Sequence, residues 1–151
     1  MTALADVKAK IVNVLKSDSA LASLLGKDRQ GQTPIYLGWQ KAENLRVPSI
    51  IVSEVSETGE VSGLGDCFDG SKRYEWYHAI IQVDVWASSS SQRDQVSSQV
   101  KKVMLANFAV FKSDGIVVSP PSVAVLDEVD EKPPIFRHSL RYPVWYVMEV
   151  S

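Results

Sequence analysis

The chain has 151 residues, of which 45% are hydrophobic and 23% are charged, and its formal net charge is −2. This length and balance predict one soluble domain, residues 1–151, with a single core. The lysines and arginines are scattered along the sequence, which argues against sequence-specific nucleic-acid binding because phosphate contacts need a local basic patch. The charge is still compatible with a surface past which DNA slides without being held.

The sequence also indicates in which cellular compartment the protein is expected. No stretch approaches 18 consecutive apolar residues, so we expect no membrane span. Lysines interrupt the apolar residues of positions 1–16, which is not the pattern of a signal peptide. Cys67 is the single cysteine, so it has no partner for an internal disulfide and suits a reducing cytoplasm.

Two helices are expected before the first strand. Apolar residues recur at helical spacing through residues 4–16, and residues 19–25 follow as a shorter helix. Asp18 or Ser19 can cap this second helix at its N-terminus, and Gly26 suits the left-handed residue past its end.

The first strands lead into a long polar segment. A short strand is expected at residues 34–39 and a longer one at residues 47–55. Residues 53–73 contain four glycines and five carboxylates, and loops beyond about 12–15 residues are uncommon unless they are functional or disordered. We therefore predict a long flexible loop or hairpin at about residues 55–73, and we hypothesise that it becomes ordered on contact with a partner.

The strand that follows alternates between two kinds of side chain. In residues 74–87 one set of alternate positions is mainly apolar and is expected to face the core, whereas the other set mixes bulky aromatic and polar residues. The expected core-facing residues are Tyr77, Ala79, Ile81, Val83 and Val85, and the mixed face consists of Trp76, His78, Ile80, Gln82, Asp84 and Trp86.

The C-terminal half predicts one helix and three strands. The helix covers residues 88–108 and is capped by one of its serines. Its buried stripe is expected at Val96, Val100, Val103 and Ala106 or Asn107. The strands are expected at residues 116–118, 122–129 and 135–150. Because hairpin-like turns join these strands, the order of elements predicts an α+β fold with a mainly antiparallel sheet packed against two main helices.

The last expected strand is unusually long. Its 16 residues would reach roughly 50 Å when fully extended, against about 17–20 Å for a common strand. Either a break or bulge at Pro143 divides the strand, or part of it projects from the domain and pairs with another molecule. The sequence leaves both alternatives open.

No catalytic or ligand-binding constellation emerges from the sequence. Residues 63–72 lack the order of a phosphate-binding loop or a dinucleotide fingerprint, and their aspartates lack the spacing of a calcium loop. Cys67, His78 and His138 offer at most three soft ligands without a close pair, which argues against zinc. His138 and Ser139 point to opposite faces of one strand, so they cannot serve the same catalytic triad. We therefore expect no enzyme, no metal and no cofactor.

Several segments occur in a characteristic order along the chain, namely LASLLG, PIYLGW, VPSIIVSEVSETGE, IQVDVWASSSSQRDQV and FRHSLRYPVWY. Taken together they resemble the small tail-completion or tail-terminator (tail-to-head joining) proteins of long-tailed phages and prophages. In that family a strand carrying Val-Asp-Val-Trp leads into a serine-rich helix cap. The match covers most of residues 4–146, and the loop at residues 55–73 is longer and richer in glycine than the family pattern.

The resemblance implies a structural virion protein. Subunits of such families form a homo-oligomeric ring, commonly a hexamer, that caps the tail tube, ends its polymerisation and joins it to the head. The implied partners are further copies of the chain, the tail-tube protein and the head–tail connector protein. The implied locations are the virion tail and, during assembly, the host cytoplasm. A ring needs a heterologous interface, in which two different patches meet head to tail.

We expect this interface to use the mixed strand face, the helix cap, the last strand and the carboxylates of the polar segment. The alternatives are another neck or head-completion protein, a tail-tube subunit, or a non-virion cytoplasmic module that binds a ligand or peptide under the loop as a lid. The expected subunit or partner interface consists of Glu57, Glu60, Asp66, Asp69, Trp76, Asp84, Trp86, Arg93, Arg137 and Arg141.

Overall fold

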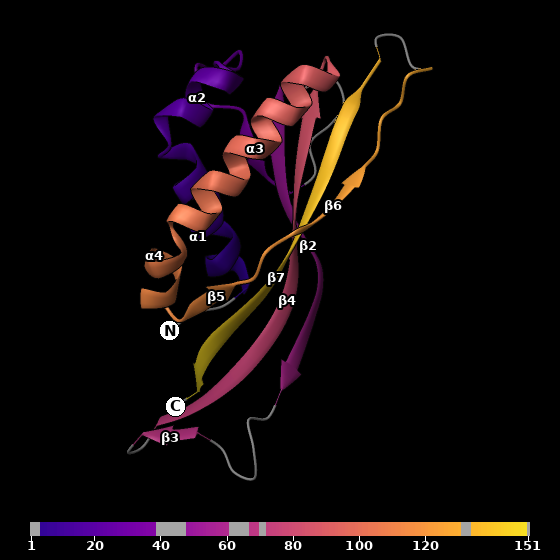
Figure 1. Ribbon diagram of the computed structural model, residues 1–151. Helices are drawn as coiled ribbons and strands as arrows, with labels where there is room; N and C mark the ends of the chain where they lie inside the picture. Colours follow the sequence, from indigo (N-terminus) through magenta and orange to yellow (C-terminus); the bar gives the residue numbers. More distant parts are fainter. Residues whose placement is uncertain (1–3, 39–47, 61–66, 70–71, 131–133, 151) are drawn as a thin grey trace.

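The computed structural model describes residues 4–38, 48–60, 67–69, 72–130 and 134–150 (Figure 1). The helices are α1 (Leu4–Lys16), α2 (Ser19–Leu25), α3 (Ser90–Ala106) and α4 (Phe108–Ser113). The strands are β1 (Ile35–Leu37), β2 (Ser49–Glu60), β3 (Cys67–Asp69), β4 (Lys72–Ala87), β5 (Ile116–Val118), β6 (Ser122–Val125) and β7 (Phe136–Val150).

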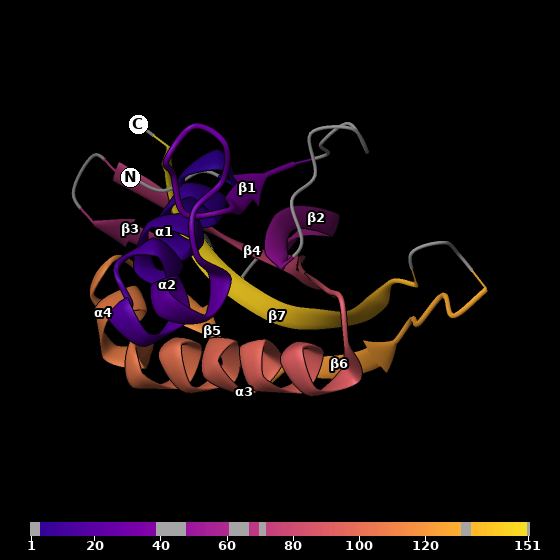
Figure 2. The ribbon, with the colours of Figure 1, turned by 90° about the horizontal axis from the view of Figure 1, so that it is seen from above.

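The seven strands in the described part of the chain form one mixed sheet. Its order is β1-β2-β4-β7-β5, and β3 pairs with β4 while β6 pairs with β7. β1 runs parallel to β2, and the other pairings of the described strands are antiparallel. Helices α1 and α3 lie over one face of this sheet (Figures 1 and 2). The predicted α+β fold with a mainly antiparallel sheet is confirmed.

The helices are positioned by their apolar stripes and by caps. Asp18 accepts a hydrogen bond from the backbone N–H of Leu21 at 2.8 Å, and Ser89 accepts one from the N–H of Gln92 at 3.1 Å. Each cap satisfies a backbone donor that the first helical turn leaves free. The stripes then meet the sheet in a single core, to which the two main helices contribute Val7, Ile11, Leu15, Val96, Val100 and Val103.

The two long strands present one apolar face to these helices. On β4 the alternate residues Ala79, Ile81, Val83 and Val85 are fully buried, as the alternation predicts, and Tyr77 packs against the same core. On β7 the corresponding residues are Leu140, Tyr142, Val144 and Tyr146. The opposite face of both strands carries no helix (Figure 1).

β7 runs unbroken through Pro143, so the alternative in which this proline divides the strand is wrong. Pro143 lies opposite Ile80 of β4, and its carbonyl oxygen accepts a hydrogen bond from Ser119 N–H at 2.9 Å. The N and the C=O of one strand residue point to the same side, so the missing N–H of Pro143 points toward the connection between β5 and β6. No strand of the described chain needs a donor there, and the proline is tolerated.

The segment predicted as a long flexible loop or hairpin at about residues 55–73 forms a hairpin of β2 and β4 where it is described, and its ordering on contact with a partner stays a prediction. β2 continues to Glu60, β3 occupies residues 67–69 and β4 begins at Lys72, while the rest of this segment lies outside the described residues. The outer half of β2 shows no apolar alternation because both of its faces are exposed. Backbone pairing with β4, rather than side-chain burial, makes it a strand.

Gly59, which the sequence suggested to be a source of flexibility, has a packing role. It lies opposite Tyr77 in the β2–β4 ladder, and a Cβ atom at this position would come within 3.0 Å of Tyr77 Cε1. The glycine therefore leaves room for the tyrosine ring, which stacks on Tyr146 with ring centroids 5.5 Å apart. The lower halves of β4 and β7 thus form a pair that extends past the helices (Figure 1).

Candidate partner interface

The face of the sheet opposite the helices is the candidate partner interface. In the β4–β7 ladder Gln82 lies opposite Arg141, Asp84 opposite Ser139 and Trp86 opposite Arg137, and cross-strand partners point to the same side. We call this surface the helix-free face, and it is formed by Trp76, Gln82, Asp84, Trp86, Arg137, Ser139 and Arg141. The interface residues expected from the sequence that lie on it are Trp76, Asp84, Trp86, Arg137 and Arg141.

A hollow of about 360 Å³ opens on the helix-free face. Strand β2 lines it from one side, β4 forms its floor, and β7 contributes the opposite wall. It is lined by Ile51, Ser53, Glu54, Gln82, Asp84, Trp86 and Arg137. The hollow is therefore bordered by two carboxylates, one guanidinium and an indole, all from neighbouring strands.

Arg137 and Trp86 form one wall of this hollow as a stacked pair. Arg137 Cζ lies 4.7 Å from the centroid of the Trp86 ring, a geometry in which the cation is attracted by about 0.5–2 kcal/mol. The guanidinium covers the indole, which is only 9% exposed although no helix lies over this face. The pair presents a flat, cationic surface to an incoming molecule.

Several buried polar atoms on this side of the sheet make no hydrogen bond within the described residues. Asp84 is 8% exposed, and Gln82 Nε2 donates to its Oδ2 at 2.8 Å, but its Oδ1 has no donor. An unsatisfied buried polar group costs about 1–3 kcal/mol. The set contains both acceptors and donors, which a partner's peptide groups match, and it consists of Ser49 Oγ, Asp84 Oδ1, Trp86 Nε1, Arg137 Nε and Ser139 Oγ.

Trp76 lies toward the other end of the same face. It is half-buried and faces Val147 of β7 across the ladder. Next to it, His78 stacks on Trp145 with ring centroids 4.4 Å apart. The aromatic residues thus continue the helix-free face along the part of β4 and β7 that extends past the helices.

Arg93 does not lie on the helix-free face. It projects from the first turn of α3, where it forms an ion pair with Asp94 at 3.0 Å and another with Asp127. Asp127 also accepts a hydrogen bond from the backbone N–H of Arg137 at 3.1 Å. The Arg93 guanidinium lowers the pKa of Asp127 below its usual value. Arg93 therefore ties α3 to the start of β7.

Among the carboxylates expected from the polar segment, Glu57 has a described side chain, and this side chain does not lie on the helix-free face. Glu57 lies on the helix side of β2 and accepts a hydrogen bond from the Tyr146 hydroxyl. Glu60 ends β2 and Asp69 ends β3, but their side chains lie outside the described part of the structure, as does the whole of Asp66.

His138 faces the helices rather than the helix-free face. Its Nδ1 lies 2.7 Å from Ser97 Oγ of α3, and its Nε2 lies 3.7 Å from Asp94. Burial, reinforced by the positive charge of Arg93, lowers the pKa of His138. Ser139 points the other way, so the argument against a triad from adjacent strand residues is confirmed.

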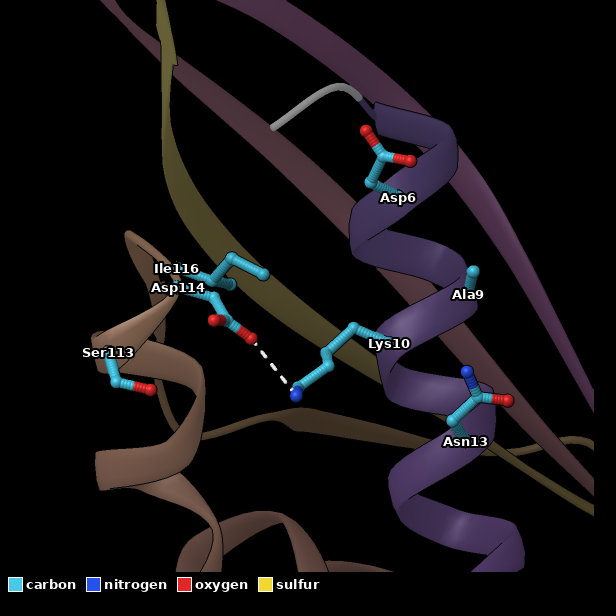
Figure 3. A pocket seen from close by; sticks show the side chains of 7 residues that line it. All are labelled: Asp6, Ala9, Lys10, Asn13, Ser113, Asp114 and Ile116. Atoms are coloured by element: carbon cyan, nitrogen blue, oxygen red, sulfur yellow. Dashed lines mark ion pairs between the residues drawn. The ribbon is translucent and has the colours of Figure 1, made fainter. Parts of the chain in front are cut away.

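A second hollow, of about 490 Å³, lies between α1 and the end of α4 (Figure 3). Lys10 reaches across it to Asp114 at 3.0 Å, so that the two charges offset each other. Among the described residues there is no group of three or more His, Cys, Asp or Glu side chains that could hold a metal ion. No helix in the described ranges is long and apolar enough to cross a membrane.

The sequence analysis missed an apolar groove between α3 and the β5–β6 connection. The groove has a volume of about 340 Å³, and Leu105 on its rim is 78% exposed. Helical periodicity identified the buried stripe of α3 and passed over residues outside it. A leucine off the stripe was the available signal, but a single exposed leucine is common on protein surfaces.

A chain of the virion of a native gene transfer agent particle is similar in structure. The TM-score is 0.51 and the sequence identity 16%, and the alignment covers 98% of this chain and 100% of that chain. The two chains therefore share an α+β fold over nearly their full length. No protein-family model matches the chain, and no curated protein sequence matches it.

Proposed function

We propose that this chain is a structural protein of a phage-like virion. The observation that carries the proposal is the full-length likeness in fold to a chain of a virion particle. A helix-free sheet face with buried, unpartnered donors and acceptors supports it, because a subunit inside a larger assembly can satisfy such groups through its neighbours.

Within the virion we propose the role of a tail terminator. The order of segments that resembles tail-completion proteins supports this role, and so does the presence of dissimilar surfaces suited to head-to-tail contacts. In this role the chain forms a ring, commonly of six subunits, that ends the growth of the tail tube and receives the head–tail connector. It assembles in the host cytoplasm and remains in the virion tail.

The helix-free face supplies the chemistry of one contact. Asp84 Oδ1 accepts from a partner's backbone N–H, while Trp86 Nε1 and Arg137 Nε donate to a partner's carbonyl oxygen. Because these groups are already buried, a partner that satisfies them gains the hydrogen bonds with little further desolvation. The tail-tube protein is the partner assigned to this face.

The first test is mass photometry with negative-stain imaging of the purified protein, alone and with tail tubes. We expect closed rings of fixed subunit number, either free or on tube ends. Unlimited filaments would instead indicate a tail-tube subunit. Monomers at every concentration that also leave tube ends bare would contradict the terminator role.

Two variants test whether the hollow on the helix-free face is the contact with the tail tube. Trp86→Ala should abolish tube binding, because it removes the indole N–H and the surface on which Arg137 stacks. The control is Trp145→Ala, which removes an indole of the same sheet face outside the hollow. If both variants bind tubes as the wild type does, the helix-free hollow is not the tube contact.

A further inference from the structure

Two exposed apolar surfaces lie on different parts of the molecule. The first is the groove lined by Met104, Leu105, Phe108, Pro120, Pro121 and Tyr142. The second, which we call the arm, is the hairpin segment of residues 125–130 that continues beyond β6. In both ribbon views the chain that leaves β6 projects away from α4 and β5 (Figures 1 and 2).

The groove offers an apolar lining with one cationic side chain, Lys101. Leu105 and Phe108 are 78% and 40% exposed, so the groove has unfilled apolar surface. Tyr142 is 2% exposed, its hydroxyl makes no hydrogen bond within the described residues, and burial raises the pKa of this hydroxyl so that it stays protonated. The groove therefore suits an apolar segment that carries acidic groups.

The arm has this pattern. Val125 and Val129 are 59% and 63% exposed, and the exposed carboxylates Glu128 and Asp130 flank Val129. The arm contains no buried residue, so its valines are not explained by the core of its own subunit.

The arm is also held in shape before it meets a partner. Leu126 N–H donates to Arg137 O at 2.8 Å, and Glu128 exchanges two backbone hydrogen bonds with Ile135. Arg93 binds Asp127 at the base of the arm. A preformed segment loses less conformational entropy on binding than a free chain would.

From these observations we infer that the arm of one copy docks in the groove of the next copy of this chain. Val129 enters the apolar groove beside Leu105, and Lys101 pairs with an arm carboxylate. Because groove and arm are two different surfaces of one subunit, each subunit uses one surface of each kind, and the contact repeats head to tail. The inference rests on the proposed ring and names the interface that closes it.

Cross-linking between differently labelled copies tests this contact. In a Cys67→Ser background, Val129→Cys and Leu105→Cys are made in separate proteins, mixed, and treated with a short bismaleimide. We expect an intermolecular cross-link in the mixture, and little in either protein alone. Cross-linking of one single variant as efficient as that of the mixture would indicate a symmetric contact and overturn the inference.

A charge exchange provides the second test. Lys101→Glu should lower the fraction of assembled protein at least tenfold, and adding Glu128→Lys and Asp130→Lys should restore it. Leu37→Asp is the matched control, since Leu37 is 48% exposed and belongs to neither surface. If the added lysines restore assembly of the Lys101→Glu variant, its loss of assembly was not caused by unfolding.

The outcomes separate this inference from the proposed function. If the Lys101→Glu variant forms the same rings as the wild type, and the mixed cysteine variants give no cross-link, the arm–groove contact is overturned. The terminator role is then unaffected. A cross-link that forms while only open chains are seen supports the contact and contradicts the closed ring. Absence of both the cross-link and any assembly overturns both.

Discussion

The two faces of the sheet are buried by different means. On the helix-covered face, apolar residues of β4 and β7 are packed under α1 and α3. On the helix-free face, Asp84, Trp86 and Ser139 are almost as inaccessible, yet they retain polar atoms without partners in the described structure. Low exposure on the first face therefore reflects apolar packing that stabilises the fold. On the second face it includes polar atoms without partners among the described residues, which fits the partner contact proposed above.

The contrast is sharpest between adjacent residues of β7. Leu140 is fully buried in the core, whereas Ser139 is 1% exposed on the opposite face and its hydroxyl has no partner among the described residues. Adjacent residues of the strand thus make opposite contributions to stability: Leu140 stabilises the fold, whereas burial of the unpaired Ser139 hydroxyl destabilises it. The following predictions test this difference, starting from the largest expected effect.

Leu140→Ala should lower the free energy of unfolding by about 2–5 kcal/mol, because it removes buried methyl groups and leaves a cavity. Ser139→Ala should change it by less than about 1 kcal/mol or raise it, since the lost hydroxyl makes no hydrogen bond in the folded subunit. Urea denaturation of both variants measures the difference. Equal losses at the two positions would show that the faces do not differ in this way.

Asp84→Leu should leave the free subunit as stable as the wild type or stabilise it by about 1–3 kcal/mol, because an unsatisfied buried carboxylate oxygen is removed. The same variant should no longer bind tail tubes. Lys102→Ala, at an exposed position of α3, is the control for both measurements. A clear loss of stability in Asp84→Leu would mean that the carboxylate already has its partners in the free subunit.

His138→Gln should flatten the dependence of stability on pH. The folded protein holds the pKa of His138 below its usual value of 6.5, so on acidification the unfolded chain takes up this proton first. The wild type should therefore lose stability as the pH falls below about 6.5, and the variant should lose less over the same range. Thermal unfolding of both proteins between pH 5 and pH 7.5 measures this slope. Parallel slopes would assign the pH dependence to other groups.

Lys10→Ala should have the smallest effect. The ion pair between Lys10 and Asp114 is partly exposed (Figure 3), and such pairs contribute at most about 1 kcal/mol. Salt should reduce the contribution further by screening. A double-mutant cycle with Asp114→Ala measures the coupling, and a value well above 1 kcal/mol would indicate that this hollow stabilises the fold.

Local signals account for most of what the sequence predicted correctly. Three such features depend only on neighbours in the chain. They are the apolar stripe of α3, the helix cap at Asp18, and the alternation of Ala79, Ile81, Val83 and Val85 on β4. The alternation also assigned Asp84 and Trp86 to the opposite face. These features are determined by periodicity and backbone hydrogen bonding, which act over a few residues.

Tertiary structure decided what depends on pairing between distant segments. The polar residues of β2 become a strand because β4 lies beside them, and Pro143 is tolerated because its missing N–H points to the connection between β5 and β6. The ion pair of Arg93 with Asp127 likewise joins residues that are distant in sequence. The groove at Leu105 and the arm at residues 125–130 are likewise surfaces of the assembled sheet and helices. No periodicity within one segment encodes such surfaces, because they arise only when separate segments are packed together.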